Sequence, residues 1–340
     1  MNVMTQARPG RPLSVLVAGG AGFVGSHLCE ALLERGHRVI CMDSFDTGVA
    51  SNVDHLASSP DFRLVRHDVA QRLPLSEPLD RVFNLASPAS PPHYQADPIR
   101  TMMTNVVGTA NLLELAAGQG ARFVQASTSE VYGDPEQHPQ AEDYWGHVNC
   151  TGPRACYDEG KRAAEALCFD YIRDRGADVR VARIFNTYGP RMRADDGRIV
   201  SNMIVQALSG APMTIYGTGQ QTRSFCYVSD LVAGLMALME VEAPLPGAVN
   251  LGNPQEFTIA ELAEQVRRLV PTRSELVHRP LPQDDPQRRR PDISRARQHL
   301  GWRPRVELTE GLPRTVAWFA SSASGTAGEA GGVPAAAASA

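Results

Sequence analysis

Short apolar runs alternate with longer amphipathic segments through the first half of the chain. The runs are rich in β-branched and aromatic side chains, which favours strands. Strands are predicted at residues 13–18, 38–42, 62–69 and 81–87. Helices are predicted at residues 26–35 and 98–117, where apolar positions recur at helical spacing. Because parallel strands need helical crossovers, this alternation predicts an α/β fold with a Rossmann-type doubly wound parallel sheet.

The pattern changes after residue 188. Proline, glycine and arginine become frequent and the apolar runs shorten. Further helices are predicted at residues 199–208, 229–239 and 259–270. The predicted organisation is a flexible N-terminus at residues 1–12, a Rossmann domain at 13–188, a smaller C-terminal substrate-binding domain mainly at 189–320 and a disordered, low-complexity tail at 321–340.

Composition narrows the possible partners and locations. The formal net charge of -4 over 340 residues argues against a nucleic-acid-binding surface, because such surfaces are basic. The N-terminus has no apolar leader and no apolar run is long enough to span a bilayer, so we expect a soluble, cytoplasmic protein without a membrane partner. The 6 cysteines form no CxxC pair and have no histidine-rich neighbours, so we expect reduced thiols and no metal site.

A glycine-rich turn joins the first predicted strand to the first predicted helix. Residues 19–25 read Gly-Gly-Ala-Gly-Phe-Val-Gly, which satisfies both the GxGxxG and the GxxGxxG spacing. Such a turn lets the backbone approach a pyrophosphate at a helix N-terminus, as in dinucleotide-binding folds. The predicted cofactor contacts in this turn are Gly19, Gly22, Phe23, Val24 and Gly25.

Later strand ends complete the predicted cofactor site. Asp43 ends the second strand, where an acid that binds the adenosine ribose hydroxyls is expected, and this favours NAD over NADP. A 2′-phosphate would meet Asp43 as a like charge, and no arginine directly follows to offset it. The alternative is that Asp43 is a turn or helix-cap residue. The ends of the next two strands add Asp68, Val69, Leu85 and Ala86 to the predicted site.

Tyr157 and Lys161 lie four residues apart in a segment of helical composition, so they share one helix face. A phenol needs its pKa lowered by roughly three units to act as a base at neutral pH, which a neighbouring ammonium and a cationic nicotinamide ring would supply. Alone, the pair also fits an ordinary exposed helix. Upstream, Thr128, Ser129 and Glu130 place an acid/base group near the pair, which favours hydride-transfer chemistry.

Several longer blocks carry a more specific signal. They include Asn84-Leu-Ala-Ser-Pro-Ala-Ser-Pro-Pro-His-Tyr94 and residues 127–135, 142–149, 152–161, 182–191 and 283–292. With these blocks the chain resembles the extended short-chain dehydrogenase/reductases and, within them, the UDP-glucuronate decarboxylases. The resemblance implies that NAD oxidises C4 of UDP-glucuronate, that carbon dioxide leaves the β-keto acid, and that the same NADH reduces the 4-keto pentose to UDP-xylose.

The resemblance also implies roles for single residues in that reaction. Tyr157 would take the C4 hydroxyl proton and later return it, while Lys161 would hold the nicotinamide ribose and lower the pKa of Tyr157. Thr128 and Ser129 would hydrogen-bond the sugar near C4 and the carboxylate. Glu130 would repel or desolvate that carboxylate and help to manage the proton delivered to C5.

The resemblance further implies substrate contacts and an assembly. The expected substrate contacts are Asn186, Arg191, Tyr216, Arg223 and Arg289. Arg289 is matched to the acidic end of the substrate, although the run of arginines at 288–290 leaves the register open by one and also fits a solvated basic turn. A homodimer is implied through the helices around residues 98–117 and 157–173.

Other functions remain open at this point. An NDP-sugar 4,6-dehydratase would share the fold, NAD and the Tyr-Lys pair, but that family places an Asp-Glu pair where this chain has Ser129 and Glu130. The elimination step of a dehydratase would then lack its general acid, because the Ser129 hydroxyl donates a proton poorly. A 4-epimerase has no evident use for Glu130. A non-catalytic protein that binds NAD and nucleotide sugars would be expected to lose Tyr157 or Lys161, and both are present.

Overall fold

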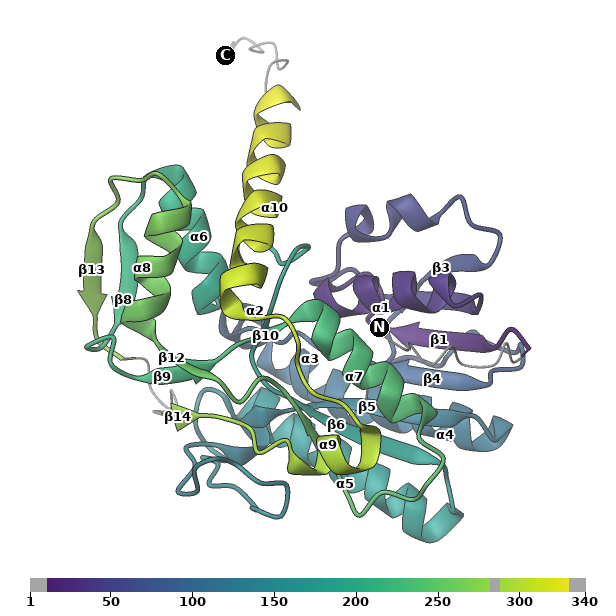
Figure 1. Cartoon of the computed structure of the whole chain (residues 1–340). Helices are drawn as coiled ribbons and strands as arrows, with labels where there is room; N and C mark the ends of the chain where they lie inside the picture. The colour runs from purple at the N-terminus through teal and green to yellow at the C-terminus, as the bar shows by residue number, and fades with distance from the viewer. Residues whose placement is uncertain (1–10, 282–287, 330–340) are drawn as a thin grey trace, which may run out of the picture.

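A seven-stranded parallel sheet forms the centre of the computed structural model, which describes residues 11–281 and 288–329 (Figure 1). The strand order is β11-β6-β5-β4-β1-β2-β3. The strands are β1 (Ser14–Ala18), β2 (Arg38–Asp43), β3 (Phe62–Arg66), β4 (Arg81–Asn84), β5 (Arg122–Thr128), β6 (Val179–Ile184) and β11 (Val249–Leu251). The predicted Rossmann-type doubly wound sheet is therefore confirmed.

Helices cover both faces of this sheet. Helices α1 (Phe23–Glu34) and α7 (Val228–Glu240) pack on one face, and α4 (Thr109–Gln119) and α5 (Ala155–Arg175) pack on the other. Every residue of β1 is buried between the two layers. A strand buried on both faces needs apolar side chains at every position, which is why β1 shows no alternation of polar and apolar residues.

The helix predicted at residues 98–117 is interrupted by a wider turn. It consists of α3 (Pro98–Met103), a π-helical segment η3 (Thr104–Gly108) and α4. Preceding it is the short helix α2 (Pro91–Ala96). A Cβ atom on Gly108 would lie 2.6 Å from Val69, so the close approach of this segment to the end of the third strand requires glycine.

The strand order reverses at β1. From β1 the chain runs outward through β2 and β3, and it then returns to continue through β4, β5 and β6 on the other side. At such a point, loops that leave the carboxyl ends of neighbouring strands turn to opposite faces and open a crevice. The glycine turn after β1 and the ends of β4 and β5 all meet at this edge. The short helix η4 (Ser129–Tyr132) directly follows β5 there.

Part of the chain after residue 188 returns to the central sheet, while the division into domains at that residue stays a prediction. Helix α7 and strand β11 return to the central sheet, where β11 pairs with β6. Strand β11 has only 3 residues, too few for a recognisable period.

The other elements are β7 (Thr187–Tyr188), β8 (Met213–Tyr216), β9 (Thr222–Ser224), β10 (Cys226–Tyr227), β12 (Glu256–Thr258), β13 (Leu276–Arg279), β14 (Arg288–Arg289), α6 (Ile199–Ser209), α8 (Ile259–Leu269), α9 (Ser294–Leu300) and α10, with the 3₁₀ turns η1 (Ala50–Asn52) and η2 (Asp54–Leu56).

The structure describes only part of each predicted terminal segment. Helix α10 (Leu308–Glu329) continues into the region expected to be a disordered tail, and in Figure 1 it projects from the body of the molecule. Its first turns are anchored by buried Leu308, Leu312 and Phe319, and a nucleated helix extends through alanine and serine at little cost. Residues 330–340 and 1–10 lie outside the described residues. Arg11 pairs with Asp80.

Arg122 fastens the start of β5, the strand that leads to the crevice. Its guanidinium is largely buried and donates to the carbonyl oxygens of Met239 at 2.9 Å and Val241 at 3.1 Å, and to Asp178 at 2.6 Å. We expect Arg122→Met to lower the free energy of unfolding by about 3 kcal/mol, because two backbone carbonyls lose a charged donor. Urea denaturation would measure the change.

The matched control is Glu242→Gln. Glu242 also pairs with Arg122, but its side chain is 81% exposed. Exposed ion pairs contribute little, so we expect a much smaller loss of stability than for Arg122→Met. Equal losses in the two variants would show that the buried carbonyl contacts are not what holds β5.

Candidate active site

A cavity of about 560 Å³ opens at the carboxyl ends of the central strands. The β1–α1 turn, the ends of β4 and β5, the start of α5 and loops from the C-terminal half line it. The predicted site residues in its lining are Gly19, Gly22, Phe23, Val24, Gly25, Leu85, Thr128, Ser129, Glu130, Tyr157, Lys161, Asn186, Arg191, Tyr216, Arg223 and Arg289. The structure thus brings the predicted catalytic and substrate residues, and most predicted cofactor residues, around one space.

The glycine turn leaves no room for side chains. A Cβ on Gly25 would lie 2.1 Å from the carbonyl oxygen of Gly19, and a Cβ on Gly19, at φ +76°, would lie 2.7 Å from the backbone of Leu85. Within the described chain, α1 has no side-chain cap and no acid in its first turn. Uncapped N–H groups at a helix N-terminus suit an anionic pyrophosphate, so the residues present fit NAD.

The remaining predicted cofactor residues do not line the cavity; these are Asp43, Asp68, Val69 and Ala86. Asp43 is buried, and its carboxylate accepts the backbone N–H groups of Ala21 at 2.9 Å and Phe45 at 2.8 Å. Asp68 faces Arg100 at 3.4 Å. The observed contacts make Asp43 a support of the glycine turn, and its binding of the ribose hydroxyls stays a prediction.

Tyr157 and Lys161 face the cavity from the first turns of α5, and both are buried. The Nζ of Lys161 donates to the carbonyl oxygen of Ala126 at 2.9 Å and lies 5.9 Å from the centre of the Tyr157 ring. Tyr94 of α2 stacks on Tyr157, with ring centres 5.0 Å apart and planes inclined by 5°. The phenol ring therefore has one orientation relative to the cavity.

Burial governs the protonation of this pair. It raises the pKa of Tyr157 above the usual value for tyrosine, and the Thr128 side chain opposes the rise. Burial lowers the pKa of Lys161 to about 8, against the influence of Cys168 and Glu165. Without a bound cofactor the pKa of Tyr157 is therefore raised. That Lys161 lowers this pKa stays a prediction for the complex with a cationic cofactor.

Glu130 lies between two guanidinium groups. Its Oε1 accepts from Arg289 at 2.6 Å, and its Oε2 accepts from Arg154 at 2.6 Å. Arg289 is 2% exposed and also donates to the Ser129 hydroxyl at 3.0 Å and to the carbonyl oxygen of Gly133 at 3.0 Å. We call Glu130, Arg154 and Arg289 the acid-site cluster. It joins the end of β5, the start of α5 and β14.

The same contacts show which arginine of the run 288–290 faces the cavity. Arg289 is the residue that points inward to Glu130, whereas Arg288 is exposed and Arg290 pairs with Glu256 at 3.5 Å. Because β14 pairs with β9, its successive side chains point to opposite sides.

The charge of Glu130 follows from its partners. Burial would raise its pKa, but Arg289 and Arg154 outweigh burial and lower the pKa to about 2. Glu130 is therefore a carboxylate throughout the neutral range. Two guanidinium groups facing one carboxylate suit the binding of a further anionic group.

The predicted substrate residues reach the cavity from several elements. Asn186 follows β6, and its carbonyl oxygen accepts the N–H of Cys226 at 2.8 Å. Arg223 on β9 is buried, while Tyr216 at the end of β8 is 39% exposed. Arg191, at φ +67°, donates to Glu30 at 2.7 Å. The C-terminal half therefore supplies several walls of the cavity, and Arg191 ties one of them to α1.

Sequence reasoning did not single out Tyr94, Arg154 and Arg198, which also line the cavity. Arg198 pairs with Asp196 at 2.5 Å, and its guanidinium carbon lies 5.9 Å from the centre of the Phe23 ring. Arg154 precedes Tyr157 by one helical turn, so its place on the same helix face could have been predicted from the sequence. Tyr94 gave no local signal, because its role depends on stacking against a residue far along the chain.

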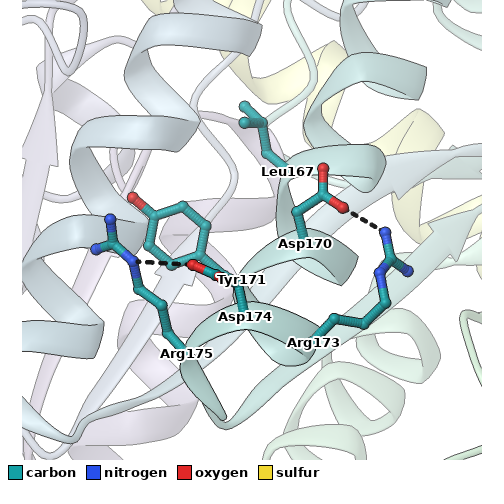
Figure 2. A pocket seen from close by; sticks show the side chains of 6 residues that line it. All are labelled: Leu167, Asp170, Tyr171, Arg173, Asp174 and Arg175. Atoms are coloured by element: carbon teal, nitrogen blue, oxygen red, sulfur yellow. Dashed lines mark hydrogen bonds and ion pairs between the residues drawn. The ribbon is translucent and has the colours of Figure 1, made fainter.

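A second depression, of about 500 Å³, lies over the last turns of α5. Figure 2 shows its lining side chains, Leu167, Asp170, Tyr171, Arg173, Asp174 and Arg175. The Tyr171 hydroxyl donates to Glu114 of α4 at 2.8 Å. This depression therefore belongs to the outer surface of α4 and α5 and shares no residue with the cavity at the sheet edge.

Two kinds of site are absent from residues 11–281 and 288–329. No group of three or more histidine, cysteine, aspartate or glutamate side chains in these ranges is arranged to hold a metal ion. In the same ranges, none of the helices is both long and apolar enough to cross a membrane.

Known proteins resemble the chain in both sequence and structure. UDP-glucuronic acid decarboxylase 1 of Danio rerio is 56% identical over 305 residues, which cover 90% of this chain and 72% of that protein. UDP-glucuronic acid decarboxylase 6 of Arabidopsis thaliana is 53% identical over 88% of this chain and 87% of its own length.

Among solved structures, a UDP-glucuronic acid 4-epimerase from Bacillus cereus, in complex with UDP-glucuronic acid and NAD, has a TM-score of 0.81 at 28% identity, covering 90% of this chain and 98% of its own. Residues 15–252 match the NAD dependent epimerase/dehydratase family. The chain thus belongs to the NAD-dependent epimerase/dehydratase family and, within it, to the UDP-glucuronic acid decarboxylases.

Proposed function

We propose that this protein converts UDP-glucuronate to UDP-xylose and carbon dioxide with NAD as its cofactor. The observation that carries the proposal is the acid-site cluster in a chain that is more than half identical to decarboxylases. The cluster offers two guanidinium groups beside Ser129 and Thr128. A sugar with a neutral hydroxymethyl group would leave such buried donors poorly matched, whereas a sugar acid matches them.

Proton transfer at C4 is the part of the redox steps that the protein's own residues perform. Bound NAD supplies the acceptor and later the donor of hydride. Tyr157 takes the C4 hydroxyl proton during oxidation and returns it during the final reduction. Lys161 is placed one turn along the same helix to hold a ribose, and Thr128 orients the hydroxyl. Stacking of Tyr94 on Tyr157 limits the phenol to one approach.

Decarboxylation breaks the bond between C5 and C6 of the 4-keto acid. The bonding electrons move into the C4 carbonyl as an enolate, carbon dioxide leaves, and C5 then takes a proton. Glu130 assists by competing with the substrate for Arg289, so the leaving carboxylate is held less firmly than Arg289 alone would hold it. With a pKa of about 2, Glu130 is not itself the acid that protonates C5.

The alternative reactions find less support from the residues around Thr128 and Ser129. A 4,6-dehydratase needs an acid beside the threonine, and this position is the Ser129 hydroxyl, which accepts a hydrogen bond from Arg289. A UDP-glucuronic acid 4-epimerase is among the similar structures. Its product would keep the carboxylate, whereas the product of a decarboxylase loses it, so the product distinguishes the two reactions. A non-catalytic protein would have no reason to keep Tyr157 and Lys161 buried together in the cavity.

We also propose a homodimer and a cytoplasmic location. Ile99 and Met103 on α3 are 77% and 47% exposed, and with the depression over α5 in Figure 2 they give α3, α4 and α5 an outer surface suited to a second copy. The cysteines are unpaired, and Cys150 is exposed, which suits a reducing compartment.

Tyr157→Phe tests the proposed base. We expect turnover of UDP-glucuronate to fall by about a thousandfold with binding nearly unchanged, because the ring still stacks but no longer transfers the proton. Steady-state kinetics and calorimetric titration would measure the two effects. Tyr144→Phe is the control, since the Tyr144 hydroxyl accepts only the N–H of Glu136, at 3.1 Å, among its recorded contacts. Normal turnover in Tyr157→Phe would remove Tyr157 from the mechanism.

Glu130→Ala tests the reaction type. We expect release of carbon dioxide to fall by about a hundredfold or more while NAD binding is kept, because the glycine turn is untouched. Carbon dioxide release, nicotinamide absorbance and nucleotide-sugar products would be followed together. For the unaltered protein, formation of a 4-keto-6-deoxy sugar from UDP-glucose without decarboxylation would establish the dehydratase instead, and a C4 epimer that keeps its carboxylate would establish the epimerase.

Ile99→Asp tests the homodimer. A charge at this exposed apolar position would have to be buried on association, so we expect the protein to elute and scatter light as a monomer. Leu276→Asp on β13, where the wild-type leucine is 38% exposed, is the matched control and should leave the assembly unchanged. A dimer that survives Ile99→Asp would place the interface elsewhere.

A further inference from the structure

A buried ion pair joins α5 to β6, and the mechanism above does not use it. Glu165 of α5 accepts from Arg183 of β6 through both carboxylate oxygens, from Nη2 at 2.8 Å and from Nε at 3.0 Å. The side chains of Glu165 and Arg183 are 9% and 14% exposed, and neither residue lines the cavity. Taking two charges out of water costs about as much as their attraction returns, so stability alone does not explain the pair.

The pair continues the helix face that carries Tyr157 and Lys161. Glu165 follows Lys161 by four residues, as Lys161 follows Tyr157, so the three side chains lie on one face of α5. This face is bonded to the end of β5. Lys161 donates to the carbonyl oxygen of Ala126 at 2.9 Å, and the Ser127 hydroxyl donates to Glu165 at 2.5 Å. The helix face is thus held at two consecutive residues of the strand.

Arg183 extends the same connection to the acid side of the site. It lies beside Ser127 in the sheet, because β6 pairs with β5 at these positions. Its Nη1 donates to the Tyr132 hydroxyl at 3.0 Å, and its guanidinium carbon lies 4.9 Å from the centre of the Tyr132 ring. Tyr132 is buried and ends η4, the turn that carries Ser129 and Glu130. A chain of buried contacts therefore runs from α5 through β6 to η4.

We propose that Glu165 is a positioning residue that sets the separation between Tyr157 and the acid-site cluster. The inference rests on the proposed function, because in that reaction both groups act on one sugar ring, Tyr157 at C4 and the cluster at the carboxyl group on C5. Such a reaction needs the two groups at a fixed separation. Glu165 lies outside the cavity lining and acts through Ser127 on β5 and through Arg183 on η4.

Loose positioning has a distinct consequence for this reaction. Oxidation and decarboxylation convert UDP-glucuronate and NAD to a 4-keto pentose, carbon dioxide and NADH, and the proton released at C4 balances the proton taken up at C5. The last step returns hydride and a proton to C4. At that stage the sugar has lost the carboxyl group that the acid-site cluster holds. A displaced Tyr157 therefore slows the last step most, and the 4-keto pentose leaves before it is reduced.

Glu165→Gln tests the inference, because it keeps the shape of the side chain and removes the charge that holds Arg183. Well below the unfolding temperature, we expect the turnover number to fall by about tenfold to a hundredfold, with the KM for UDP-glucuronate changed by less than about twofold. Nicotinamide absorbance and separation of the nucleotide sugars should show more NADH and more released 4-keto pentose than in the unaltered protein.

A control separates positioning from stability. Arg122→Met breaks a buried ion pair at the other end of β5, where Arg122 meets Asp178 at 2.6 Å. This variant should unfold more easily, while its turnover number and products stay those of the unaltered protein. If Glu165→Gln does not fold, Tyr132→Phe replaces it, since this change removes only the hydroxyl that accepts from Arg183 and donates to Asn250 at 2.8 Å. A fall in turnover of about threefold or more, with released 4-keto pentose, is then expected.

Two results would overturn the proposal. One is an unchanged turnover number and product mixture in the variant that folds, and the other is a change of equal size in Arg122→Met, which would mean that any loosening of β5 has the same effect. Failure of the proposed function is separate, because it is seen in the unaltered protein as the absence of carbon dioxide release from UDP-glucuronate, and the inference then falls with it.

Discussion

The pairing of Glu130 with two guanidinium groups is the interaction on which the active site depends. It joins three elements that are remote in sequence, since Glu130 follows β5, Arg154 precedes α5 and Arg289 lies on β14. Loss of one partner would leave a buried charge without compensation, so these elements must keep their relative positions. Tyr157 lies one helical turn beyond Arg154, and its place relative to Ser129 follows from the same contacts.

Such a cluster contributes more to selectivity than to stability. Taking several charges out of water costs as much as their mutual attraction returns, so an apolar substitute of equal volume would hold the fold as well. What an apolar substitute would not do is distinguish a sugar acid from a neutral sugar. The hydrogen bonds of Arg289 to Ser129 and Gly133 fix its guanidinium before any ligand arrives, which reduces the ordering that binding requires.

Local patterns were sufficient to predict the first half of the fold. The runs that form β1, β2 and β4 are continuous and buried, and the glycine turn after β1 has a steric cause that the sequence shows directly. The positions of Tyr157, Lys161 and Arg289 in the cavity were likewise predictable, because they follow from helical spacing and from long matching blocks of sequence.

The remaining features depend on tertiary contacts that no short window contains. Strand β11 has 3 residues and is defined by its pairing with β6. Tyr94 acquires its role by stacking on Tyr157. The return of the chain to the sheet after residue 188 was not predicted for the same reason, since a change in composition marks where a chain leaves a sheet but not where it comes back.

That return has a consequence for how the two halves of the molecule move. The polypeptide crosses between the central sheet and the substrate-facing part more than once, outward after β6, inward through α7 and β11, and outward again at β12. The substrate-facing part is thus an insertion with several covalent tethers, unlike a module joined by one linker. Any relative motion of the two halves must therefore bend several crossing segments together, and one proteolytic cut would not release either half.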